Sequence, residues 1–135
     1  MAFSINPQLE QDSIFLDRWT LCDVRLINDQ QYPWILLIPR REGVRDLHEL
    51  TQEDYLQLMK ESRRLSETMQ TLFQSEKMNV AALGNVVPQL HLHHIARYQS
   101  DPAWPKPVWG LFPMQPYSNE QLQEIKEKLL PYLTS

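Results

Sequence analysis

The pattern of apolar and polar residues predicts two β-strands in the first third of the chain. Residues 21–27 alternate imperfectly, and residues 34–38 form a compact apolar run that ends at Pro39. The polar residues 28–31 between them are typical of a turn. We therefore expect these two segments to form an antiparallel hairpin.

Two more strands are predicted in the second half of the chain, at residues 79–83 and 89–96. The loop between them is short and contains Gly84 and Pro88. Because a connection of this length leaves no room for a crossover, the two strands should be antiparallel neighbours.

A period of three to four residues predicts the helices. The longest should span residues 51–74, with a stripe of Leu, Met and aromatic residues facing the core. Asn6-Pro7 is typical of a helix start and predicts a short helix through about residue 12. A capping box at residues 118–121 begins a C-terminal helix that we expect to end at Pro131. Strand pairs with one long helix between them indicate an α+β fold.

Length, charge and composition exclude several classes of protein. With 135 residues, the chain 1–135 should form a single domain with one core. The net charge of -4 argues against a nucleic-acid partner, which would require a basic surface. No apolar run approaches the length of a membrane span, and the N-terminus has no secretory leader. With Cys22 as the only cysteine, we expect a cytoplasmic protein that contacts no membrane and forms no intrachain disulfide.

Candidate chemistry is concentrated in Gln89-Leu90-His91-Leu92-His93-His94-Ile95, which holds three of the four histidines of the chain. Strict alternation places Gln89, His91 and His93 on one face of the expected strand. His94 breaks the pattern: it belongs on the core face unless a strand end or bulge turns it outward. Inside the core, both of its ring nitrogens would need hydrogen-bond partners.

Two histidines that share a strand face can divide the steps of a group transfer. Imidazole has an ordinary pKa of about 6.5, so it can be a neutral nucleophile at one step and a proton donor at the next. Phosphorus is the electrophile that fits, because an imidazole nitrogen forms a phosphoramidate that can be hydrolysed. His-x-His is also a metal-ligand arrangement, but Arg97 and Tyr98 downstream supply no further ligand. A third interpretation makes the histidines ordinary hydrogen-bonded surface groups.

The stretch from Gly84 to Ile95 resembles the signature of the histidine triad (HIT) superfamily, His-φ-His-φ-His-φ-φ, where φ is apolar. Residues 26–28 and 34–40 are similar to the nucleotide-binding hairpin of that family. Residues 101–110 resemble the tail of a bacterial branch described as hydrolases of dinucleoside polyphosphates such as diadenosine tetraphosphate.

This resemblance implies a HIT-like fold with an antiparallel sheet of about five strands, a homodimer, and no metal or organic cofactor. The implied ligand is a purine nucleotide or dinucleoside polyphosphate, cleaved at its α-phosphorus through a covalent nucleotidyl-histidine. Carried onto this chain, the nucleophile is His91, and His93 contacts phosphate or supports departure of the leaving group. Asn28 takes the place of the ribose contact and Asn85 that of a phosphate contact.

Two residues depart from the family pattern. Gln89 stands at the first triad position, and Trp34 stands where many members have a fourth histidine. The amide of Gln89 can still accept a hydrogen bond from Nδ1 of His91 and so direct Nε2 toward phosphorus. We therefore expect a hydrolase or transferase, slowed by the missing histidine. The alternative is a nucleotide-binding regulatory module of the same fold with weak or no catalysis.

Overall fold

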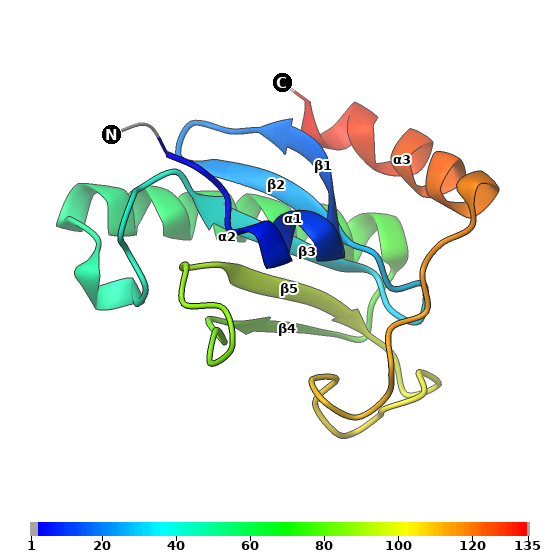
Figure 1. Cartoon of the computed structure of the whole chain (residues 1–135). Helices are drawn as coiled ribbons and strands as arrows, with labels where there is room; N and C mark the ends of the chain where they lie inside the picture. Colours follow the sequence, from blue (N-terminus) through cyan, green and yellow to red (C-terminus); the bar gives the residue numbers. More distant parts are fainter. Residues whose placement is uncertain (1–2, 135) are drawn as a thin grey trace.

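Five antiparallel strands form one sheet in the order β1-β2-β3-β5-β4 in the computed structural model, which describes residues 3–134 (Figure 1). The strands are β1 (Ser13–Arg18), β2 (Cys22–Ile27), β3 (Trp34–Pro39), β4 (Lys77–Ala81) and β5 (Leu92–Arg97). The helices are α1 (Pro7–Asp12), α2 (Gln52–Phe73) and α3 (Asn119–Leu133), with a short 3-10 turn at Leu47–Glu49. The predicted α+β fold is confirmed, as are the β2–β3 hairpin and the antiparallel β4–β5 pair.

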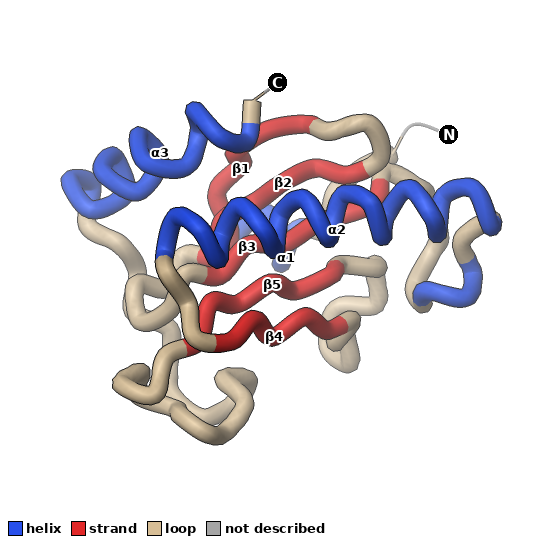
Figure 2. The backbone as a smooth tube through the Cα atoms, turned by 180° about the vertical axis from the view of Figure 1, so that it is seen from behind, coloured by secondary structure: helices blue, strands red, loops and turns tan. Residues whose placement is uncertain are grey.

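Both faces of the sheet are covered. The long helix α2 crosses one face with α3 beside it (Figure 2), and α1 lies on the opposite face. Along β3, Ile35 and Leu37 belong to the core under α2, whereas Trp34, Leu36 and Ile38 belong to the core on the α1 side. A strand buried on both faces has no polar side to display, which explains the uninterrupted apolar run of β3.

One strand and several element boundaries differ from the predictions. Strand β1 was not predicted; a register shift between Phe15 and Asp17 disrupts its alternation, and Phe15 is 45% exposed. Strand β4 spans Lys77–Ala81 where residues 79–83 were expected, and β5 begins at Leu92, three residues later than expected. Helix α3 continues through Pro131 to Leu133. The side chain of Leu133 is buried, and its carbonyl accepts hydrogen bonds from two other side chains. These contacts hold the last turn of the helix in place.

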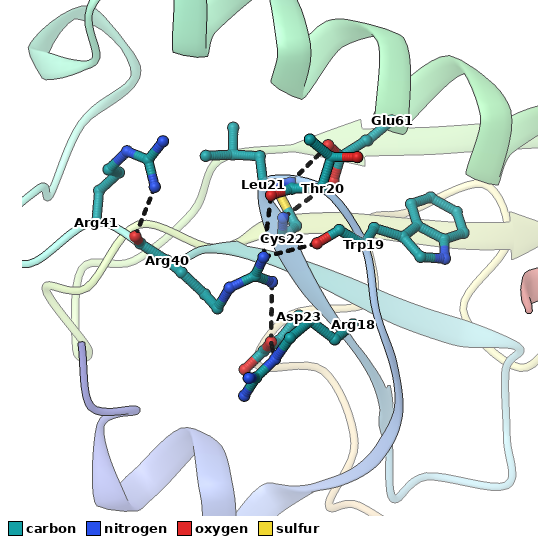
Figure 3. A network of polar contacts seen from close by, with 9 residues as sticks. All are labelled: Arg18, Trp19, Thr20, Leu21, Cys22, Asp23, Arg40, Arg41 and Glu61. Atoms are coloured by element: carbon teal, nitrogen blue, oxygen red, sulfur yellow. Dashed lines mark hydrogen bonds and ion pairs between the residues drawn. The ribbon is translucent and has the colours of Figure 1, made fainter. Parts of the chain in front are cut away.

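The turn between β1 and β2 is fixed by two charged side chains (Figure 3). The Glu61 carboxylate of α2 accepts hydrogen bonds from the N–H groups of residues 21 and 22, at 2.9 and 3.0 Å. Arg40, directly after β3, donates to the carbonyls of residues 19 and 20 and pairs with Asp23 at 3.1 Å. These contacts lock the turn between α2 and the end of β3, so Glu61 and Arg40 serve the fold.

None of the helices within residues 3–134 has both the length and the apolarity that crossing a membrane would require.

Candidate functional site

His91 and His93 lie together where β5 begins. Their ring centroids are 4.8 Å apart, and each residue is 5% exposed. The intervening leucine and His94 belong to the α2 side of the sheet, whereas His91 and His93 border a cleft on the side of α1. The predicted juxtaposition of these two histidines is therefore present in the structure.

The backbone of Gln89 fixes the proton of His91. Nδ1 of His91 lies 2.7 Å from the carbonyl oxygen of Gln89. Because a carbonyl can only accept, Nδ1 must carry the hydrogen and the neutral ring keeps its lone pair on Nε2. Burial lowers the pKa of His91 below its ordinary value, which favours this neutral form. Nε2 is thus prepared to act as a nucleophile.

The side chain of Gln89 does not make the hydrogen bond to His91 that we expected. Its Oε1 accepts from the N–H of Asn6 at 2.8 Å, and its Nε2 donates to the carbonyl of Ser4 at 2.9 Å. The expectation extended strand alternation back to residue 89, but β5 begins only at Leu92. The amide therefore holds the N-terminal segment, and the carbonyl performs the orienting task.

Both ring nitrogens of His93 are engaged by the protein. The indole Nε1 of Trp34 donates to Nδ1 of His93 at 3.0 Å, and Nε2 of His93 faces the carbonyl oxygen of Leu83 at 2.9 Å. In the β3–β5 register Trp34 pairs with Ile95 and His93 with Leu36, so Trp34 and His93 are diagonal neighbours on one face. Burial lowers the pKa of His93 to about 4.

His94 lies inside the core with a partner for each nitrogen. It is fully buried, its Nε2 lies 2.8 Å from the Ser62 hydroxyl of α2, and its Nδ1 lies 3.1 Å from the Leu92 carbonyl. Burial lowers its pKa to about 4. Of the two orientations considered from the sequence, the core one is found, and His94 joins the sheet to α2.

A cleft of about 510 Å³ opens beside His91 and His93, which is a size typical of small-ligand sites. Its walls are largely apolar and come from four segments spread between residues 8 and 114. They include Ile27, Trp34, Leu36, Val87 and Trp109. Trp109 packs edge-on against Trp34 and against His93, at centroid distances of 6.2 and 5.2 Å. The tail tryptophan is therefore part of the cleft wall.

The two predicted asparagines differ in their position. Asn85 lines the cleft. Asn28 is not among its lining residues, and its side-chain oxygen accepts from the N–H of Tyr117 at 3.0 Å. Asp12 at the end of α1 lines the cleft instead, although the sequence marked it only as the end of a helix. Asp12 reaches the cleft because of the path of the folded chain, so no local feature of the sequence predicts its position there.

The structure does not support a metal site. Within residues 3–134, no group of three His, Cys, Asp or Glu side chains is arranged so that it could hold an ion.

Arg97, at the end of β5, has a structural role. Its buried guanidinium binds the Asp101 carboxylate with two hydrogen bonds, of 2.8 and 3.1 Å, and also donates to Asn79.

Comparisons of both sequence and structure identify histidine triad proteins as similar to this chain. The model of the HIT domain family matches residues 8–100. A histidine triad protein from Marinobacter aquaeolei has a similar solved structure, with 53% identity, TM-score 0.97, and coverage of 98% of this chain and 97% of that chain. Others come from Bradyrhizobium japonicum (38%, TM-score 0.95, covering 98% and 99%) and Sinorhizobium meliloti (37%, 0.94, covering 97% of each). No curated protein matches significantly. The chain therefore belongs to the histidine triad (HIT) family.

Proposed function

We propose that this protein is a nucleotide hydrolase or transferase that acts at the α-phosphorus of a nucleoside polyphosphate or phosphoramidate. Membership of the HIT family supports a role in nucleotide binding and transfer. The observation that carries the proposal is the state of His91. Its Nδ1 proton is held by the Gln89 carbonyl, and the ring borders a cleft of nucleotide size.

The reaction has two displacements at phosphorus. Nε2 of His91 attacks the α-phosphorus, and the bond to the leaving group breaks with its electron pair remaining on that group. The imidazole becomes a cationic nucleotidyl-histidine, whose Nδ1–H still donates to the Gln89 carbonyl. Water then attacks the same phosphorus, the electron pair of the P–N bond returns to Nε2, and the proton of water passes to solvent. The product is the nucleoside monophosphate.

The cleft supplies a binding mode for the nucleotide. Its apolar walls suit a purine base, and Asn85 is assigned to the phosphates near His91. The ribose end is assigned to Asp12, which lines the cleft. Asn28 is assigned to hold Asp12 in place, because its backbone N–H donates to the Asp12 carbonyl at 2.9 Å.

A homodimer is part of the proposal. In the sheet order β4 is a terminal strand, and it carries Val80 with 45% of its surface exposed. Terminal strands offer backbone groups for pairing with another chain. Sedimentation velocity should give twice the chain mass, and Val80→Glu should shift the population toward monomer. A monomeric wild type would contradict this part.

The test of the activity is a metal-free incubation with diadenosine tetraphosphate and with adenosine 5′-phosphoramidate. Products are separated by chromatography and covalent adducts are weighed by mass spectrometry. Wild type should release AMP and show an AMP adduct, whereas His91→Ala should fold but lose both. The matched control is His48→Ala, because His48 is an exposed histidine after β3. Turnover retained by His91→Ala would contradict the proposed mechanism.

The regulatory-module alternative has a distinct outcome in the same experiment. It predicts that neither substrate reacts, although AMP raises the melting temperature of wild type and His91→Ala alike. Both ring nitrogens of His93 are hydrogen-bonded within the protein, and this observation is the reason to test the alternative.

A further inference from the structure

His93 holds a single proton, on the nitrogen that faces away from Trp34. An indole N–H can only donate, so Nδ1 of His93 must present its lone pair to Trp34 at 3.0 Å. A backbone carbonyl can only accept, so Nε2 must carry the hydrogen toward Leu83 at 2.9 Å. The neutral ring thus satisfies both partners.

A second proton on His93 has no favourable place. Protonated Nδ1 would direct one N–H at the N–H of Trp34, leaving both donors without an acceptor in a residue that is 5% exposed. The rings of His91, Trp34 and Trp109 lie against it, with centroids at 4.8, 5.7 and 5.2 Å. None of these three is an anion that would stabilise an imidazolium.

We infer that Trp34 is a specificity-determining positioning residue: its N–H, together with the burial of the His93 ring, keeps His93 neutral and so restricts turnover to leaving groups that depart as anions. The substrate class is then a phosphoanhydride, such as a nucleoside polyphosphate, and phosphoramidates with amine leaving groups are poor substrates. This inference rests on the proposed attack of His91 at the α-phosphorus.

The electron balance of the first displacement explains the restriction. With an anhydride, the P–O bond breaks and its oxygen keeps the electron pair, giving a stable phosphate anion without any proton. With a phosphoramidate, the P–N bond would give a strongly basic nitrogen anion unless a proton reaches that nitrogen as the bond breaks. His93 cannot supply this proton, because its single N–H binds Leu83 and its loss would leave a buried imidazolate.

The test compares kcat/KM for diadenosine tetraphosphate and adenosine 5′-phosphoramidate in wild type and Trp34→Phe. Phe keeps an aromatic ring but removes the N–H, so Nδ1 of His93 becomes free to accept a proton. A general acid typically contributes about 100-fold to 10,000-fold in rate. Wild type should therefore prefer the anhydride by about 100-fold or more, and Trp34→Phe should reduce that preference at least 10-fold. General damage to the cleft would lower kcat/KM for both substrates, so the ratio of the two values does not depend on it.

The pH profile and a control variant separate this effect from a structural one. In Trp34→Phe the ratio of the phosphoramidate rate to the anhydride rate should rise as the pH falls and His93 takes up a proton, with no such rise in wild type. Protonation of His91 lowers both rates alike, so it does not change this ratio. Trp104→Phe, at a tryptophan of the tail outside the cleft lining, should retain the wild-type preference. Equal use of both substrates by wild type would overturn the inference and leave the proposed function standing.

Nitrogen NMR of the imidazole rings provides a readout that needs no variant. In wild type, His93 should show a protonated Nε2 and an unprotonated Nδ1 from pH 7.5 to pH 5. Protonation of Nδ1 within that range overturns the inference. Failure of wild type to cleave either substrate overturns the proposed function, and the substrate restriction with it.

Discussion

The Nδ1 atom of His91 lies 2.7 Å from the carbonyl oxygen of Gln89. The side-chain amide of Gln89 points to the N-terminal segment, where it bonds residues 4 and 6. One residue therefore contributes to two tasks through separate groups: its backbone orients the candidate nucleophile, and its side chain anchors the chain before α1. This separation makes the two tasks accessible to separate experiments.

The pH dependence of turnover should report the state of His91. Only the neutral ring has a lone pair on Nε2, and burial lowers its pKa from the ordinary value. We therefore expect kcat/KM to stay level as the pH falls from 7.5 to about 6.5, the pKa of an unshifted histidine, and to decline only below it. The measurement is a kcat/KM profile with diadenosine tetraphosphate, with folding monitored by circular dichroism. A half-maximal point at or above about pH 6.5 would contradict the assignment.

Replacing Gln89 by Ala should affect stability more than chemistry. The variant keeps the backbone carbonyl that binds His91 but loses both hydrogen bonds to the N-terminal segment. At about 0.5–1.5 kcal/mol for each bond, we expect urea unfolding to show a loss of about 1–3 kcal/mol. We also expect kcat to fall less than 10-fold. A loss of about 100-fold or more in kcat with unchanged stability would return the amide to a catalytic role.

The period of two correctly predicted that His91 and His93 are neighbours, because it requires only a locally extended chain. It failed for Gln89, since the pattern continues through residues that precede β5 and does not show where pairing begins. The hydrogen bond from Trp34 to His93 lay beyond sequence reasoning for a different reason. Trp34 and His93 are 59 residues apart in the sequence, and the register between β3 and β5 decides whether they meet. A single sequence reveals faces, but not which residues of distant strands meet.

Gly84 should be intolerant of a side chain because of its close neighbours. A Cβ there would lie 2.7 Å from the carbonyl oxygen of Val87 and 3.2 Å from Cε1 of His91. The carbonyl oxygen of Val87 cannot move away unless the loop that lines the cleft moves with it. We expect Gly84→Ala to lower kcat/KM by about 10-fold to 100-fold, in line with the cost of misplacing reacting groups. Gly84→Val should be worse.

Stability measurements are the control for this prediction. The loop at Gly84 is on the surface, so its displacement should cost less than about 1 kcal/mol in the free energy of unfolding. Activity equal to wild type in Gly84→Ala would show that the loop does not position His91.

His94 should make the protein sensitive to mild acid. Its pKa is about 4 in the folded protein, compared with about 6.5 when unfolded. Below about pH 6.5 the unfolded chain takes up a proton that the folded protein does not, so the free energy of unfolding decreases as the pH falls toward 4. For this one residue, linkage gives a loss of about 2 kcal/mol between pH 7.5 and pH 5.

The measurement is urea unfolding of wild type and His94→Gln at both pH values. Gln can still accept a hydrogen bond from Ser62 but does not titrate, so it removes the acid sensitivity of this position alone. His93 also has a lowered pKa and remains in both proteins, so its contribution cancels in the comparison. The variant should be less stable than wild type at pH 7.5 but should lose about 2 kcal/mol less on going to pH 5. Equal losses in the two proteins would mean that His94 is not held neutral against α2.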